Sequence, residues 1–342
     1  MELIEIKDLN SDAWNDMICG FSTSAIFHTS HWLDFVEKTQ KGIRVILKIR
    51  EKNDTIGYFV GVIIKKGPFS ILGSPLTGWT TQFMGPVVRD SFPQELFLDA
   101  LETYCRSVGI HQIELSAPIL RPDILLKHRF KCRRDVTPIV NLSVDEQVMW
   151  KKLKSKSCRY EIRKALKKGV RVEETDDPKI IDRFYDQLIE VFAKQSLVPT
   201  YGRDRVKYLF ECLKPKDMLI CLEAKYKKRV IGTALFPHDD HWVYYWGGAS
   251  DFAHRALSPN ELIQWTLMKI AAKRGIGKYD MYGGDNRFKL KFGAEVKDVY
   301  FWVKSFNPLA GFARDSYQQL FNVRQRVTGS LKRLHRTKIQ DG

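Results

Sequence analysis

The feature that most limits the fold of this chain is an order of short helices and strands that occurs twice. In the first half, short helices precede two strands joined through Lys52-Asn53-Asp54, a turn sequence that predicts an antiparallel hairpin. A longer helix and further strands follow. The elements of this half are expected at residues 4–6, 12–18, 31–38, 44–49, 56–64, 93–108, 112–115 and 138–142.

The second half repeats the order after a basic helix that Gly169 ends. Its elements are expected at residues 158–168, 179–194, 204–213, 218–224, 230–236, 242–246, 259–274, 278–281 and 296–304. We therefore predict a mixed α/β (α+β) fold with two tandem acetyltransferase-like domains, each a mostly antiparallel mixed sheet flanked by helices. The domains are expected at 1–145 and 146–306, followed by a basic helical tail at 307–342 that packs back on the first domain. The alternative for this tail is that it lies on anionic lipid.

Charge narrows the class of partner. The chain carries a net charge of +16. Its 342 residues are more than one ordinary hydrophobic core supports, which agrees with two domains. Basic side chains crowd residues 151–168 and 324–338, so two basic surfaces are expected. Such surfaces favour nucleic acid, anionic lipid or phosphate-bearing substrates, and the charge does not choose among them.

Other patterns argue against a secreted, membrane-spanning or metal-binding protein. No apolar run reaches the roughly 20 residues that span a bilayer, and the N-terminus lacks the order of a signal peptide. We expect a cytoplasmic protein, with peripheral contact at the inner face of the plasma membrane left open. The scattered cysteines predict reduced thiols, and the block 238–241 predicts a turn, so no metal site is expected. His28 and His31, beside Trp32, are expected to be packing or surface residues, with a catalytic role as the alternative.

Four segments carry a family resemblance. They are residues 25–32, the basic helix at 150–170, the stretch 244–262 with Ser258-Pro259-Asn260, and a last segment that runs from Tyr279-Asp280 through Gly283-Gly284 to the ending Phe288-Lys289 to Phe292-Gly293. Together they resemble the Fem-type aminoacyl and acyl transferases of the GNAT superfamily, including their exopolysaccharide-associated acetyltransferase relatives. The resemblance extends over most of the chain.

What the resemblance implies is an N-acyltransferase. It would transfer an acyl or aminoacyl group to an amine of a cell-envelope or polysaccharide precursor, a phosphorylated or lipid-linked sugar or peptide such as those of peptidoglycan or exopolysaccharide. Fem-type members use aminoacyl-tRNA as donor, whereas the more distant relatives are thought to use an acyl thioester of coenzyme A or a carrier. Either donor remains open, so tRNA is among the expected partners, and no tightly bound cofactor or metal is expected.

The same resemblance implies roles for individual residues. Lys289 would stabilise the oxyanion, with Phe288 beneath the ligand. The alternative is that Phe288 is a core residue and that Lys289 and Lys291 point into water. Asp280 and Asp285, with Glu261 nearby, are the carboxylates that could take the proton of the amine, although substrate-assisted transfer needs none.

A second group is expected to hold the substrate. Arg203 offers a bidentate fork to phosphate, and Tyr201, Tyr245 and Trp246 supply aromatic contacts. The alternative is that Arg203 begins a helix and the tyrosines are half-buried.

Ser258, Pro259, Asn260 and Glu261 read as the N-cap and first turn of a helix whose N–H groups could dock an anion. Because residues 255–258 contain no glycine, binding of coenzyme A in the usual way is doubtful. The alternative is a capped helix without a ligand.

The rival hypothesis is a binding protein. A non-catalytic acetyltransferase-like scaffold could hold RNA or an anionic membrane surface through its basic face. Salt dependence would separate it from an enzyme, since pure phosphate binding weakens steeply with salt.

Overall fold

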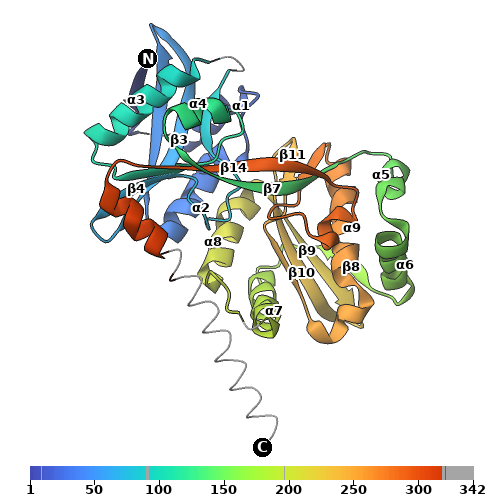
Figure 1. Cartoon of the computed structure of the whole chain (residues 1–342). Helices are drawn as coiled ribbons and strands as arrows, with labels where there is room; N and C mark the ends of the chain where they lie inside the picture. Colours follow the sequence, from blue (N-terminus) through green and yellow to red (C-terminus); the bar gives the residue numbers. More distant parts are fainter. Residues whose placement is uncertain (9, 90–91, 196, 318–319, 321–342) are drawn as a thin grey trace, which may run out of the picture. The chain divides into compact units, whose positions relative to one another are not determined.

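The computed structural model describes residues 1–8, 10–89, 92–195, 197–317 and 320 (Figure 1). The chain forms two compact units. Unit 1 comprises Met1–Val136 and Asp298–Asp315, and unit 2 is built on Thr137–Lys297. The domain limits expected from the sequence remain a prediction. In the structure, β7 (Lys131–Asn141) and β14 (Glu295–Ser305) each run from one unit into the other.

Unit 1 is a mixed sheet with helices. Its strands follow the order β1-β2-β3-β4-β6-β14-β7, with β5 beside β3, and only the β4–β6 pair among those with a known register is parallel. Its further elements are β1 (Glu2–Glu5), α1 (Ser11–Cys19), α2 (Ser30–Gln40), β2 (Ile43–Glu51), β3 (Asp54–Lys66), β4 (Phe69–Ser74), β5 (Gly85–Val88), α3 (Gln94–Ser107), β6 (Gln112–Leu115) and α4 (Pro122–Lys127). The predicted hairpin is confirmed as β2 and β3, with Arg44 opposite Val62.

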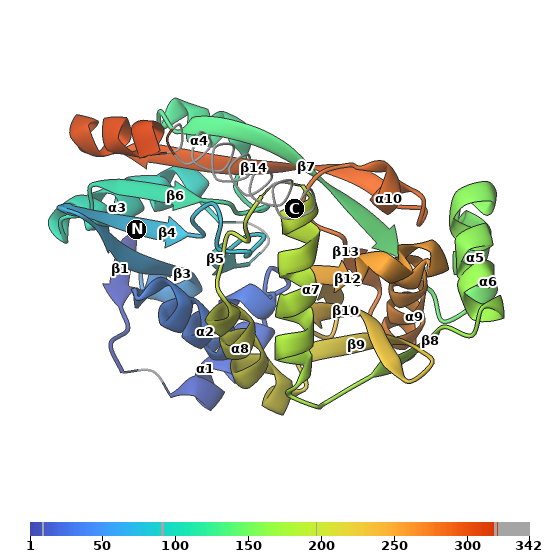
Figure 2. The ribbon, with the colours of Figure 1, turned by 90° about the horizontal axis from the view of Figure 1, so that it is seen from below.

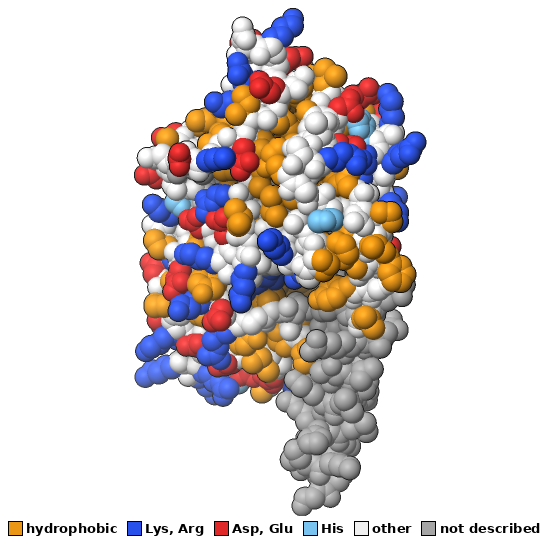
Figure 3. All heavy atoms as spheres, turned by 90° about the vertical axis from the view of Figure 1, so that its left-hand side faces the viewer, with side chains coloured by type: hydrophobic (Ala, Val, Ile, Leu, Met, Phe, Trp, Pro, Cys, Tyr) orange, Lys and Arg blue, Asp and Glu red, His pale blue; other side chains and the backbone are white. Residues whose placement is uncertain are grey.

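One face of unit 1 carries apolar side chains among charged ones. Figure 3 shows hydrophobic groups gathered on the side of the molecule where Figure 1 labels α3. A groove of about 420 Å³ is lined by Met1 and Leu3 of the first strand region and by side chains of α3, among them Leu96 and Tyr104. None of its lining residues is a predicted site residue.

Unit 2 contains a four-stranded antiparallel sheet in the order β12-β10-β9-β8. A second set pairs β11 parallel to β13, and β13 antiparallel to residues 139–141 of β7. The bounds of these elements are β8 (Arg171–Glu174), α7 (Ile180–Lys194), α8 (Arg203–Leu213), β9 (Leu219–Tyr226), β10 (Arg229–Pro237), β11 (Trp242–Tyr244), β12 (Gly247–Ser250), α9 (Pro259–Lys273), β13 (Lys278–Asp280) and α10 (Arg287–Leu290).

Helices cover both faces of the four-stranded sheet, because successive residues of a strand point to opposite sides. A Cβ added at Gly232 of β10 would meet Pro259 and Ile263 of α9. The hydroxyl of the next residue, Thr233, instead donates to Gln187 of α7 at 2.8 Å. Helices α9 and α7 therefore lie on opposite faces of this sheet (Figure 2).

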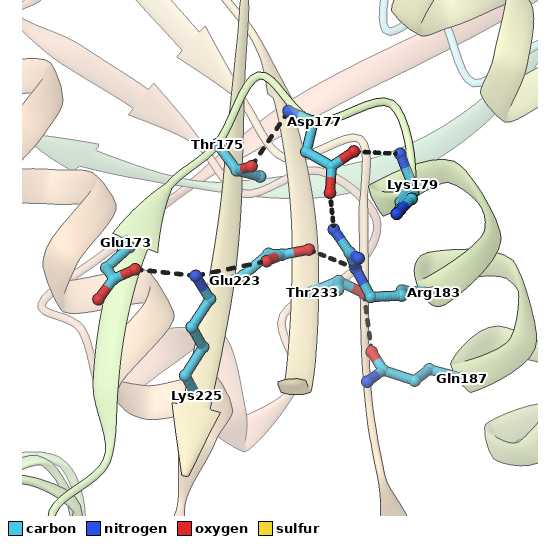
Figure 4. A network of polar contacts seen from close by, with 9 residues as sticks. All are labelled: Glu173, Thr175, Asp177, Lys179, Arg183, Gln187, Glu223, Lys225 and Thr233. Atoms are coloured by element: carbon cyan, nitrogen blue, oxygen red, sulfur yellow. Dashed lines mark hydrogen bonds and ion pairs between the residues drawn. The ribbon is translucent and has the colours of Figure 1, made fainter. Parts of the chain in front are cut away.

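A network of polar side chains fills the face under α7 (Figure 4). Glu223 of β9 lies opposite Thr233 in the ladder and is 2% exposed. Its Oε1 accepts from Nε of Arg183 on α7 at 2.7 Å, and the same guanidinium bonds Asp177 at 2.9 Å. Lys225 reaches Glu173 at 2.9 Å and Glu223 at 3.9 Å. The buried carboxylate thus has the cationic partners that burial of a charge requires.

A basic helical arm precedes the sheet of unit 2. It consists of α5 (Glu146–Lys152), one π-helical turn (Ser155–Arg159) and α6 (Tyr160–Lys167). Ile162 and Ala165 of α6 are buried in the same core cluster as Leu262 of α9. The predicted helix ending at Gly169 is confirmed in its last two turns, and its apolar spacing is what docks it on the core.

One predicted strand is wrong. Residues 242–246 do not form a single strand, because the chain changes sheets within them. The N–H of Tyr245 donates to the carbonyl of Asp280 at 2.8 Å, whereas the N–H of Trp246 donates to Leu235 at 3.2 Å. The first bond continues the pairing of β11 with β13, and the second begins the pairing of β12 with β10.

The predicted tail is described only at its start. Residues 308–317 are helical, and Ala310 is buried. Arg314 donates to Glu114 of β6 at 2.5 Å, within unit 1. Most of the predicted 307–342 segment, residues 321–342, lies outside the described residues.

Candidate functional site

The candidate site is centred on the residues at which the chain passes from β11 to β12. The bond from Tyr245 to Asp280 joins this crossing to the end of β13. The rings of Trp246 and Tyr201 lie 5.3 Å apart, and Phe184 of α7 lies 6.1 Å from Trp246. Asp280 and three of the predicted substrate-binding aromatic residues are therefore linked in one region of unit 2.

Asp280 is a buried carboxylate, 6% exposed. Its Oδ1 accepts from the hydroxyl of Thr137 and from the N–H of Tyr282, the latter at 2.8 Å. Burial raises the pKa of Asp280, while these two bonds and the charge of Lys289 lower it by less. A carboxylate with a raised pKa is a better proton acceptor than an exposed one.

Lys289 lies beside this carboxylate. It is 8% exposed, and its ammonium donates to the carbonyl oxygens of Tyr282 and Gly283. Asn286 caps the short helix α10 by accepting from the N–H of Lys289 at 3.1 Å. The alternative in which Lys289 points into water is wrong, because the left-handed turn at Tyr282 and Gly283 directs two carbonyls to its ammonium.

Lys291 is also buried, at 9% exposed, and its ammonium donates to Glu261 at 2.6 Å. It lies over the ring of Phe288, 4.5 Å from the centroid. Phe288 is partly buried and packs edge-on against Phe292 at 5.4 Å. Lys291 therefore does not point into water either.

The aromatic part of the site is close-packed. A Cβ added at Gly247 would lie 3.0 Å from the Phe184 ring and 3.6 Å from the Tyr201 hydroxyl oxygen. Burial raises the pKa of Tyr245 to about 12 and that of Tyr201 above its ordinary value. Both phenols therefore stay protonated at neutral pH and can serve as donors.

Arg203 is directed elsewhere. Its guanidinium is exposed and pairs with two carboxylates of α7, Asp182 at 2.6 Å and Asp186 at 2.8 Å. Arg205, which was not among the predicted site residues, lies with its guanidinium 5.6 Å from the Tyr201 ring centroid, and burial lowers its pKa. Its position in the sequence could have indicated this residue. Arg205 follows Arg203 by two residues on the same predicted helix, and residues two apart on an α-helix point to different sides.

The start of α9 differs from the prediction. Ser258 has a left-handed backbone (φ 57°), and its hydroxyl donates to Glu161 of α6 instead of accepting from α9. Glu261 does not complete a capping box, since it accepts from Lys291. Asn260 donates to the Ser250 hydroxyl at 3.1 Å. The capping prediction is wrong because carboxylate and ammonium groups distant in sequence bind these side chains.

The charges around this helix start are balanced. Lys164 donates to Glu161 at 2.8 Å, so each of the carboxylates Glu161 and Glu261 has its own lysine partner. Asp285 is exposed in the turn before α10. Within the part of the chain that the structure describes, no group of three or more His, Cys, Asp or Glu is arranged to hold a metal ion.

Known proteins share this architecture. Residues 153–290 match the family model of the acetyltransferase (GNAT) domain. The structure of FemX is similar with a TM-score of 0.69 at 14% identity, covering 88% of this chain and 97% of that one. A tandem GNAT protein from the clavulanic acid biosynthesis pathway gives 0.56 at 9% identity, covering 90% and 99%. L-PGS from Bacillus licheniformis gives 0.51 at 13% identity, covering 90% and 96%. No curated protein sequence matches the chain.

Proposed function

We propose that this chain, in which residues 153–290 form an acetyltransferase (GNAT) domain, is an N-acyltransferase acting on an amine of a cell-envelope or polysaccharide precursor. The observation that carries the proposal is the buried Asp280, which lies beside the β11–β12 crossing with Lys289 next to it. This pair combines a proton acceptor with a fixed positive charge, the two groups that acyl transfer to an amine needs.

In the proposed reaction the amine nitrogen attacks the acyl carbonyl carbon. The new C–N bond forms, the bond from the acyl carbon to the oxygen or sulfur of the donor breaks, and the leaving group takes up the proton that the amine loses, passed on by Asp280. Asp280 accepts the proton that the attacking amine loses. Both bonds that Asp280 accepts reach Oδ1, so we assign the proton to Oδ2. Lys289 contributes positive potential where the oxyanion develops and holds the Tyr282–Gly283 turn in place.

We propose aminoacyl-tRNA as the donor. At the start of α9, where a pyrophosphate could dock, the carboxylate of Glu161 accepts from the Ser258 hydroxyl. Glu161 and Glu261 each pair with a lysine, so two of the cations near this helix start are already bound to carboxylates. This arrangement argues against coenzyme A bound in the usual way and supports the donor implied by the Fem-type resemblance.

The acceptor site is proposed at Tyr201, Tyr245 and Trp246. These residues present aromatic faces and phenolic donors next to Asp280. We assign the acceptor's phosphate contact to Arg205 and not to Arg203, because the guanidinium of Arg205 lies 5.6 Å from the Tyr201 ring centroid.

The test is a transfer assay with two donors. The chain is incubated with total aminoacyl-tRNA or with acetyl-coenzyme A, using a nucleotide-linked muramyl peptide and an amino sugar as acceptors, and products are identified by mass spectrometry. We expect amide product and a rise in Tm with aminoacyl-tRNA. Product from acetyl-coenzyme A would overturn the proposed donor. A rise in Tm with tRNA and no product from either donor would favour the non-catalytic scaffold.

A further inference from the structure

The basic arm formed by α5, the π-helical turn and α6 has more charge than its surroundings balance. Residues 145–168 contain nine Lys or Arg and three Asp or Glu. Exposed cations on this arm are Lys151, Lys152, Lys154, Lys156, Arg163, Lys167 and Lys168. Among the described residues, none of these seven forms an ion pair with a carboxylate. Their positive potential is therefore available to a partner.

Apolar side chains lie among these charges. Tyr160 is 59% exposed and Leu166 54% exposed on α6, and Val148 of α5 is 43% exposed. Tyr160, Arg163 and Lys167 are spaced at i, i+3 and i+7, so they share the side of α6 opposite the buried Ile162. The exposed side of the arm is thus both cationic and apolar.

The arm presents one surface, since its two helices are joined. The guanidinium of Arg163 on α6 lies 5.4 Å from the ring centroid of Trp150 on α5. Trp150 in turn packs 5.1 Å from Trp265 of α9. The N–H of Lys154, between the helices, donates to the carbonyl of Lys291 at 2.9 Å. These contacts anchor the arm to the core of unit 2.

We propose that this basic arm binds the surface of an anionic lipid bilayer. Anionic head groups attract clustered lysines, and the interface accepts apolar side chains such as Tyr160 and Leu166. A nucleic-acid backbone would also bind the lysines and arginines through its phosphates, but it offers no apolar surface to an aliphatic side chain such as Leu166. No helix of the described residues is long and apolar enough to cross a bilayer.

The test is sedimentation of the full chain with vesicles. We expect binding to equal parts of phosphatidylglycerol and phosphatidylcholine, and none to phosphatidylcholine alone. The K167Q/K168Q variant should bind the anionic vesicles at least about tenfold more weakly, since each cation near the surface contributes about 1 kcal/mol. The matched control K65Q/K66Q removes two exposed charges from the end of β3 and should bind as the parent does. Equal weakening by both variants would overturn the assignment of the arm.

A second variant separates lipid from nucleic acid. Y160S/L166S keeps every charge of the arm and should weaken vesicle binding severalfold, including at high salt, while binding of uncharged total tRNA stays unchanged. Unchanged vesicle binding by this variant, or binding of the parent to tRNA but not to vesicles, would overturn the proposal. Transfer activity does not enter these measurements, so failure of the proposed function leaves their outcome interpretable.

Discussion

At the scale of single residues, Asp280 carries the strongest prediction for the proposed chemistry. Asp280→Asn keeps an oxygen that accepts from Thr137 and Tyr282 but removes the proton acceptor. We expect kcat to fall about 10²- to 10⁴-fold with little change in KM. The matched variant Asp285→Asn alters the exposed candidate carboxylate and should leave kcat near the parent value. A large loss of kcat in Asp285→Asn, with none in Asp280→Asn, would show that Asp285 is the base.

Lys289 should influence the same reaction through charge. Its ammonium lowers the pKa of Asp280, so Lys289→Met should raise that pKa further. A base must be deprotonated, and the rate therefore falls as pH drops through its pKa. We expect the acid limb of the pH–rate profile to move to higher pH in Lys289→Met, with kcat about 10²-fold lower. Lys289→Arg should move the limb back, and an unmoved limb in Lys289→Met would contradict the assigned contact.

The burial of His28 should make the free energy of unfolding depend on pH. This imidazole of unit 1 is 1% exposed, and burial lowers its pKa from 6.5 to about 4. The unfolded chain then binds a proton between these values while the folded chain does not, so stability is lost as pH falls from 6.5 towards 4. The loss attributable to His28 approaches about 3 kcal/mol.

Chemical denaturation of His28→Gln at pH 7 and pH 4.5 checks this. Its free energy of unfolding should change less between the two pH values than that of the parent. His241→Gln, which alters an exposed histidine, should behave as the parent does. An equal pH dependence in the parent and His28→Gln would contradict the assignment.

At the scale of elements, the network in Figure 4 ties α7 to the sheet. Arg183→Met would leave Glu223 buried without its closest cation, and we expect a loss of about 2–3 kcal/mol in the free energy of unfolding. This expected loss is smaller than the loss from breaking a fully buried ion pair, because Arg183 is partly exposed. Arg203→Met removes an exposed arginine that also bonds α7 and should cost under about 1 kcal/mol. Similar losses in urea denaturation of both variants would contradict the special role of the network.

At the scale of the whole molecule, the sharing of β7 determines which fragment can fold. A fragment 137–306 keeps Ile139, Val140 and Asn141, which pair with β13, and also the Thr137 hydroxyl bonded to Asp280. The fragment 146–306, the domain expected from the sequence, lacks all of them. We expect its thermal transition, followed by circular dichroism, to be absent or far lower than that of 137–306. Equal transitions would show that β13 does not need β7.

Much of the fold is determined by the sequence alone. The β2–β3 hairpin, α9 and the basic helix were predicted within a few residues, because local periodicity and turn residues report which face of an element is buried. The resemblance also predicted the tandem GNAT-like fold, and the structure is similar to that of a tandem GNAT protein. Strand β8 was missed, since its four residues, Arg171–Glu174, are polar or half-exposed and carry little hydrophobic signal.

Only the tertiary structure decided how side chains at the site are bound. Ser258 was predicted to cap α9, but its hydroxyl bonds Glu161, which lies 97 residues earlier. Arg203 was predicted to bind phosphate, but two carboxylates of another helix hold it. The division of residues 242–250 between two sheets likewise depends on partners from β10 and β13. The physical reason is the same throughout: a polar group binds the partner that folding brings near it, and local sequence does not record that partner.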